Sequence, residues 1–142
     1  MSGKYLLDTN AIINLLKDEN SGFSLKDNEG VFFVSIITEM ELLSFKDLTK
    51  EDEAAIKELL PEPGIINIDR TIKDKTIQVR KKKSIKLPDA IICAAALVNH
   101  LTLVTDDERL FNVPGLDVVH LSDLIDKYSP VHDDSTLSEP NG

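Results

Sequence analysis

The sequence of 142 residues contains a single cysteine, no tryptophan and no long apolar run. One cysteine cannot form an internal disulfide, which favours a reducing compartment. A membrane-spanning helix needs about 20 consecutive apolar residues, and the first apolar stretch ends at Asp8. That stretch is also too short for a signal peptide. We therefore expect a cytoplasmic protein without membrane association.

Basic residues are also fewer than acidic residues. Lysine and arginine number 16 against 25 aspartates and glutamates, and the formal net charge is −9. Proteins that coat long nucleic acids are usually basic, so this acidity argues against sequence-blind binding along a polymer. It does not exclude an enzyme that handles a short stretch of RNA through a metal ion, because carboxylates around a cation add negative charge themselves.

Short apolar runs alternate with helix-like segments, which predicts βαβ units and an α/β fold with a mainly parallel five-stranded sheet flanked by helices. The predicted strands are residues 4–8, 31–35, 65–68, 101–104 and 117–120. The predicted helices are residues 11–17, 37–45, 53–60, 70–83, 88–100 and 121–128. Thr9 or Asn10 is the expected cap of the first helix and Thr49 that of the third. Residues 21–30 are interpreted as mostly loop.

We expect one domain over residues 1–128. Residues 129–142 contain two prolines, three acidic residues and few apolar side chains, so they are predicted to form a disordered acidic tail.

Acidic residues follow two of the predicted strands. Asp8 follows the first strand, and Asp106 and Asp107 follow the fourth. The carboxyl ends of parallel strands share one edge of a sheet, where ligands bind. Asp8 and Asp107 should therefore meet if their strands are neighbours. Asp89 begins the helix that feeds the fourth strand, and we expect that start at the opposite edge, away from the other acids.

The helix after the second strand adds one further candidate. Glu39 and Glu41 both flank its apolar arc and point to nearly opposite sides, so periodicity does not choose between them.

Carboxylates are the ligands that Mg²⁺ prefers, together with water and substrate phosphate. Such a cation polarises a phosphoryl group and activates a water molecule for attack on phosphorus. The three histidines and the serines form no recognisable nucleophilic triad. Three of these acidic positions also have a purely structural explanation. Asp8 would simply start a helix, and Asp89 would be a first-turn carboxylate that the helix dipole stabilises. The acids after the fourth strand would belong to a capping box formed by Thr105 and Glu108.

Four segments resemble, in order, the four motifs of PIN-domain nucleases. They are residues 6–13 (LLDTNAII), 34–43 (VSIITEMELL), 87–96 (LPDAIICAAA) and 103–111 (LVTDDERLF). The resemblance covers about residues 4–125, and its nearest branch is the VapC-type toxins of toxin–antitoxin pairs.

The resemblance implies a metal site for Mg²⁺ or Mn²⁺ held by Asp8, Glu41, Asp89 and Asp107. Asp106 departs from the family pattern and is a further candidate ligand. The resemblance also implies endonucleolytic cleavage of RNA, a homodimer, and inhibition by a small antitoxin protein whose C-terminal segment binds near the active site.

Two sets of polar residues are candidates for supporting roles. The hydroxyls of Thr9, Ser35 and Thr105 either orient the ligands from an outer shell or cap helices. The one basic cluster either is a solvated helix end or contacts RNA phosphates. It comprises Arg80, Lys81, Lys82, Lys83 and Lys86.

The expected function is that of a metal-dependent endoribonuclease. Two alternatives stay open at this point: a catalytically silent PIN-like module that binds a partner, and a phosphatase or phosphoacceptor domain that uses Asp8 as its nucleophile. The last would need a lysine, and Lys86 or Lys127 would have to serve.

Overall fold

The computed structural model describes residues 3–18, 25, 31–61 and 64–128. Five strands form one sheet in the order β3-β2-β1-β4-β5, and every pairing is parallel. The strands are β1 (Lys4–Leu7), β2 (Val31–Ser35), β3 (Ile65–Ile66), β4 (Thr102–Val104) and β5 (Val118–Val119). The α/β prediction is confirmed, and the sheet is entirely parallel. The predicted tail at 129–142 and, except for Leu25, the predicted loop at 21–30 lie outside the described residues.

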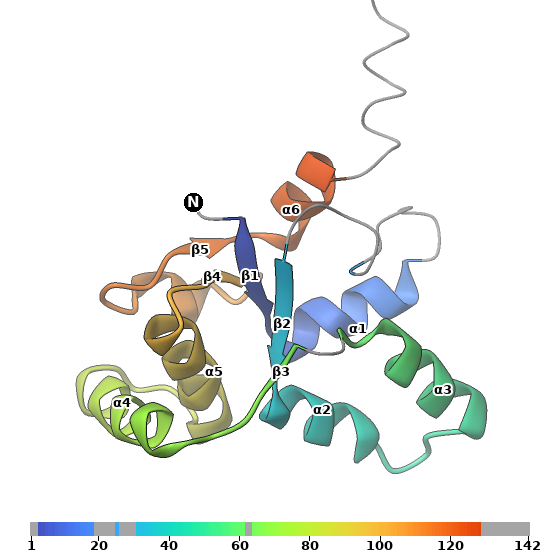
Figure 1. The fold of residues 1–142 in the computed structure, drawn as a ribbon, viewed down its shortest axis with the longest axis horizontal. Helices are drawn as coiled ribbons and strands as arrows, with labels where there is room; N and C mark the ends of the chain where they lie inside the picture. The colour runs from blue at the N-terminus through green and yellow to red at the C-terminus, as the bar shows by residue number, and fades with distance from the viewer. Residues whose placement is uncertain (1–2, 19–24, 26–30, 62–63, 129–142) are drawn as a thin grey trace, which may run out of the picture.

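Helices cover both faces of the sheet (Figure 1). They are α1 (Thr9–Lys17), α2 (Ile36–Leu43), α3 (Lys50–Leu59), α4 (Arg70–Lys82), α5 (Leu87–Val98) and α6 (Leu121–Tyr128), with a short 3₁₀ helix η1 (Glu108–Asn112). Tyr5 and Leu7 pack in the core under α1, α3 and α6, whereas Leu6 and Leu103 pack in a second core under α4 and α5. This split follows from the alternation of side chains along a strand. None of the described helices has the length and apolar character needed to cross a membrane.

The register sets the position of the acids after β1 and β4. Leu7 pairs with Val104, and the backbone N–H of Asp8 donates to the carbonyl of Val104 at 3.1 Å. β1 and β4 are therefore neighbours that end at the same level. The prediction that the segments after these two strands meet at one edge is confirmed.

The middle of helix α5 is buried, with Ala90 and residues 92–96 in the core. Small alanine side chains let this helix lie close to the sheet. Its last residue, Val98, leads through a short turn into Thr102 of β4. The helix therefore runs antiparallel to the strands, and its first turn lies at their carboxyl edge. The expected position of Asp89 at the opposite edge was wrong, because it is the end of such a helix, not its start, that adjoins the next strand.

The ends of the elements differ from the prediction at several places. Helix α1 begins at Thr9, and its cap is Asp8 rather than Thr9 or Asn10. The predicted capping box of Thr105 and Glu108 is not formed, because Asp107 caps η1. An aspartate directly after a buried strand has an extended backbone and a short acceptor side chain, which suits it to a cap.

The predicted cap of the third helix is confirmed. Thr49 caps α3 and forms a reciprocal capping box with Asp52. Helix α3 therefore begins at Lys50, directly after its cap, and its first turn contains acidic residues as predicted.

Candidate metal centre

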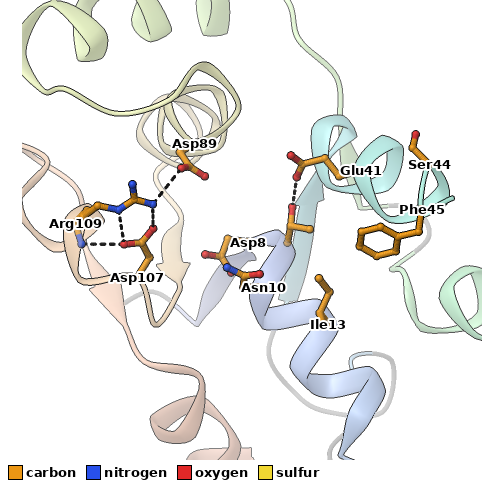
Figure 2. A pocket seen from close by; sticks show the side chains of 10 residues that line it. Asp8, Asn10, Ile13, Glu41, Ser44, Phe45, Asp89, Asp107 and Arg109 are labelled. Carbon is orange, nitrogen blue, oxygen red and sulfur yellow. Dashed lines mark hydrogen bonds and ion pairs between the residues drawn. The ribbon is translucent and has the colours of Figure 1, made fainter. Parts of the chain in front are cut away.

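Four acidic side chains line one cavity of about 470 Å³ at the carboxyl edge of the sheet (Figure 2). Asp8 comes from the junction of β1 and α1, and Glu41 comes from α2. Asp89 comes from the first turn of α5, and Asp107 precedes η1. The structure thus brings together the four residues that the sequence motifs nominated.

Asp8 is the most enclosed of the four, with 6% of its surface exposed. Its Oδ1 accepts a hydrogen bond from the N–H of Ala11 at 2.8 Å, and its Oδ2 accepts one from the hydroxyl of Thr105. Burial raises the pKa of Asp8, and the charges of Asp89 and Asp106 raise it further, against the opposing effect of the two hydrogen bonds. The carboxylate is held in a fixed position, and its ionised form is costly there.

Glu41 is positioned by a threonine pair. The hydroxyl of Thr9 donates to Oε1 of Glu41 at 2.6 Å and lies 3.0 Å from the hydroxyl of buried Thr38. Glu41 lines the cavity and Glu39 does not, which decides geometrically what helical periodicity left open.

The pKa of Asp89 is raised by burial and by two of the neighbouring carboxylates. Burial raises its pKa most, and the charges of Asp107 and Glu41 raise it as well. The nearby cations Arg109 and Lys86 lower it. The net upward direction shows that burial and the neighbouring carboxylates together outweigh the stabilisation that Arg109 and Lys86 give to the ionised form of Asp89.

The sequence analysis missed Arg109, which also lines the cavity. Its Nε donates to Oδ1 of Asp107 at 3.0 Å, and its Nη2 donates to Oδ2 at 2.6 Å. The same Nη2 lies 3.7 Å from Oδ2 of Asp89 (Figure 2). These contacts lower the pKa of Asp107 below its ordinary value. The only available signal was a positive charge two residues after Asp107, where a 3₁₀ turn brings the two side chains together.

The PIN-domain family profile matches residues 5–116 of the chain. The chain belongs to the PIN-domain family. This confirms the resemblance that the four motifs indicated, and it applies to most of the described structure.

Solved structures similar to this PIN domain include chains of toxin–antitoxin complexes. A toxin–antitoxin complex from Klebsiella pneumoniae contains a chain with 29% identity and a TM-score of 0.64, over 82% of this chain and 97% of that one. The DNA-bound VapBC from Salmonella typhimurium gives 20% identity and a TM-score of 0.70, over 83% and 98%. VapBC2 from Rickettsia felis, bound to a promoter DNA fragment, gives 18% and 0.69, over 82% and 98%. No curated protein sequence gives a significant match.

Asp106 lies outside the lining of the PIN-domain cavity. Its Oδ1 accepts a hydrogen bond from the N–H of Leu121 at 3.1 Å and lies 3.1 Å from Nδ1 of His120. Asp106 thus ties the segment after β4 to the start of α6, and it acts on Asp8 through its charge.

The three nominated hydroxyls divide into two kinds. Those of Thr9 and Thr105 donate to candidate ligands, Glu41 and Asp8. Ser35 instead caps α2, accepting from the N–H of Ile37 at 3.0 Å.

The basic cluster lies at the turn between α4 and α5. Residues 80–85 line a separate hollow of about 390 Å³ there. Arg80 is partly engaged, because its Nε donates to the carbonyl of Ile85 at 3.3 Å. Lys86 precedes α5 and is close enough to lower the pKa of Asp89. The cluster therefore adjoins the acidic cavity through Lys86.

The donor set of the cavity has the chemistry of a hard-cation site, since it offers four carboxylates on separate elements. Among the residues that the structure describes, no three His, Cys, Asp or Glu side chains are already gathered to hold an ion. On one side of the cavity the carboxylate of Asp107 is paired with Arg109 at 2.6 Å, and that of Asp89 lies 3.7 Å from the same guanidinium. The residues fit a divalent cation, provided that the side chains of Asp89 and Asp107 turn inward.

Proposed function

We propose that this PIN domain is an endoribonuclease that depends on Mg²⁺ or Mn²⁺ and acts as the toxin of a toxin–antitoxin pair. The observation that carries the proposal is the convergence of Asp8, Glu41, Asp89 and Asp107 on one cavity. A divalent cation bound there supplies the Lewis acidity that polarises a phosphodiester and lowers the pKa of water.

The protein's own residues fix one half of this site. Asp8 is held by Ala11 and Thr105, and Glu41 is held by Thr9. Ligands that neighbouring groups already hold by hydrogen bonds bind a cation without losing further side-chain freedom. The raised pKa values of Asp8 and Asp89 point the same way, because burial and the neighbouring carboxylates disfavour their ionised forms and a bound cation would favour them.

The basic cluster is our candidate contact for the RNA backbone. It adjoins Asp89, and an RNA chain whose scissile phosphate sits in the cavity can pass over Lys86 toward residues 80–83. Only five cations are involved, so the salt dependence of binding should be shallow.

The toxin role is supported by the 29% identity to a chain of a toxin–antitoxin complex. We infer that the partner is a small antitoxin protein, that the toxin forms a homodimer, and that it works in the cytoplasm. Co-expression with the product of the adjacent gene should relieve growth inhibition if that product is the antitoxin.

The direct test is cleavage of total RNA with Mg²⁺ or Mn²⁺ by wild type, Asp8→Asn and Asp106→Asn. Asp106 is a matched control, because it is the neighbouring acid that lies outside the cavity lining. We expect Asp8→Asn to lose more than about 100-fold in rate, since even outer-shell changes at metal sites cost about 10- to 100-fold. Asp106→Asn should keep most of its activity. Equal cleavage by wild type and Asp8→Asn would refute the assignment.

Metal binding separates the enzyme from a silent module. A cation that binds only the folded state raises the melting temperature. If millimolar Mg²⁺ and Mn²⁺ leave it unchanged, the module that only binds a partner becomes the better explanation.

A fluoroberyllate adduct on Asp8 would instead support a phosphoacceptor. The structure gives that reading little support. Both oxygens of Asp8 already accept hydrogen bonds, and Lys127 donates to the hydroxyl of Tyr5 at 3.4 Å.

A further inference from the structure

Arg109 is the single cation among the residues that line the acidic cavity. Its side chain is 59% exposed, so it lies at the rim and has room to move. It extends from the short helix η1 past Asp107 toward Asp89, on one side of the cavity (Figure 2).

The contacts of Arg109 occupy the carboxylates that a metal ion would need. Both oxygens of Asp107 accept hydrogen bonds from its guanidinium, and Asp89 lies 3.7 Å from the same Nη2. A guanidinium and a divalent cation repel each other at such separations. The two therefore compete for Asp89 and Asp107, whereas Asp8 is held by groups that carry no charge.

We propose that Arg109 is a displaceable cation, supplied by the protein itself, that becomes a phosphate-binding residue. It neutralises Asp107 and Asp89 until a divalent cation takes their oxygens, and it then turns to the RNA phosphate that enters the same cavity. This inference rests on the proposed ribonuclease function and adds to it a residue and an order of events.

The chemistry of arginine suits both positions. The guanidinium stays charged at any relevant pH, and its planar fork matches the two oxygens of a carboxylate or of a phosphate equally well. The Arg109–Asp107 pair lies at the rim, with Arg109 59% exposed and Asp107 20% exposed, so water reaches the guanidinium and screens the pair enough for it to be exchanged. The exchange leaves Arg109 paired with an anion throughout, since an RNA phosphate replaces Asp107 as its partner and the divalent cation takes over the charge of Asp107.

The exchange predicts that metal and RNA reinforce each other's binding. Arg109 contacts phosphate only after the cation has displaced it, so the cation should strengthen RNA binding. Linkage requires that RNA strengthen cation binding by the same factor. A residue that merely oriented Asp107 as a ligand would behave differently, because its removal would weaken metal binding.

The first measurement is the affinity of the full chain for Mn²⁺ alone, by titration calorimetry. We expect Arg109→Gln to bind Mn²⁺ about threefold more tightly than wild type, which is the scale of an exposed ion pair. Arg109→Lys keeps the charge and should stay near wild type. Arg70→Gln is the matched control, because it removes an exposed arginine at the start of α4.

The second measurement is binding of a short fluorescent single-stranded RNA, by anisotropy, with and without Ca²⁺. Gel analysis afterwards establishes that the RNA is intact. With Ca²⁺, Arg109→Gln should bind about tenfold more weakly than wild type, since it loses a charge-assisted contact. Without Ca²⁺ the two should differ by less than about twofold, because Arg109 is then engaged with Asp107.

The outcomes separate the two proposals. If wild type binds no Mn²⁺, the proposed ribonuclease function fails and the exchange fails with it. If wild type binds Mn²⁺ and Arg109→Gln binds it equally or more weakly, the ribonuclease stands and the exchange is refuted. An equal loss of RNA affinity with and without Ca²⁺ also refutes the exchange.

Discussion

Thr105 offers the most direct measure of how firmly the protein holds its central carboxylate. Its side chain is fully buried, and its hydroxyl donates to Oδ2 of Asp8 and accepts from the N–H of Asp107 at 3.0 Å. Thr105→Val keeps the shape of the side chain and removes both hydrogen bonds. The bond to a buried charge is worth about 1.5–3 kcal/mol and the amide bond about 1 kcal/mol. We expect the free energy of unfolding to fall by about 2.5–4 kcal/mol.

Thr105→Ser is the matched variant, because it keeps the hydroxyl and loses one methyl group. Burial of a methyl group is worth about 1 kcal/mol, so this variant should lose only that much. Urea unfolding followed by circular dichroism gives both values. Equal losses in the two variants would show that the hydroxyl contributes nothing to stability.

The loss in Thr105→Val should depend on pH in a defined direction. Folding raises the pKa of Asp8 above 3.8, so its ionisation costs stability as the pH rises from there through the folded-state pKa. The hydroxyl of Thr105 opposes that rise, and removing it raises the folded-state pKa further. The difference from wild type should therefore be largest at neutral pH and shrink in acid. A difference that grows in acid would refute the reasoning.

Three further predictions concern single side chains. Thr9→Val should slow RNA cleavage by about tenfold or more in a Mn²⁺ assay, whereas Thr9→Ser should not, because only the valine removes the donor to Glu41. Asp89→Asn should raise the melting temperature without metal, since the raised pKa of Asp89 means that its ionised form costs stability above pH 3.8. The same variant should abolish stabilisation by Mn²⁺, and thermal melts with and without Mn²⁺ test both expectations. The thiol of Cys93 is buried, with a pKa raised to about 12, so it should react with Ellman's reagent only as fast as the protein opens; rapid reaction in native buffer would contradict its position in the core.

The fold was predictable where the apolar pattern is clear. β2, a nearly continuous apolar run, and α6, with Leu121 and Leu124 at helical spacing, have the predicted bounds, and the buried alanines of α5 mark it as a helix that lies close to the sheet. β3 and β5 have two residues each, which is too short for any pattern to fix their ends. They are defined by pairing with β2 and β4, and pairing partners are not written in the local sequence.

The candidate site was only partly accessible from the residues. The ends of the predicted strands placed Asp8 near Asp107. Asp89 lies with them because α5 runs antiparallel to the strands, which the sequence analysis had interpreted the wrong way round. The choice of Glu41 came from the family motif, and the structure places it at the cavity. Arg109 left only a weak signal, its charge two residues after Asp107, because an arginine in a 3₁₀ turn has no periodicity and its contact with Asp89 depends on the fold.

The two halves of the cavity are stabilised by different means, and this difference bears on how it would take up a cation. Asp8 is fixed by neutral donors that a metal ion does not repel. Asp107 is fixed by Arg109, a cation that a metal ion must displace. A cavity held entirely in the first way would suffer the full repulsion of its carboxylates, and one held entirely in the second would resist the ion. With the mixed arrangement the chain folds with its four acids together, and on one side a divalent cation can replace Arg109 as the partner of Asp107. Arg109 is therefore the residue that sets how readily the cavity takes up a cation.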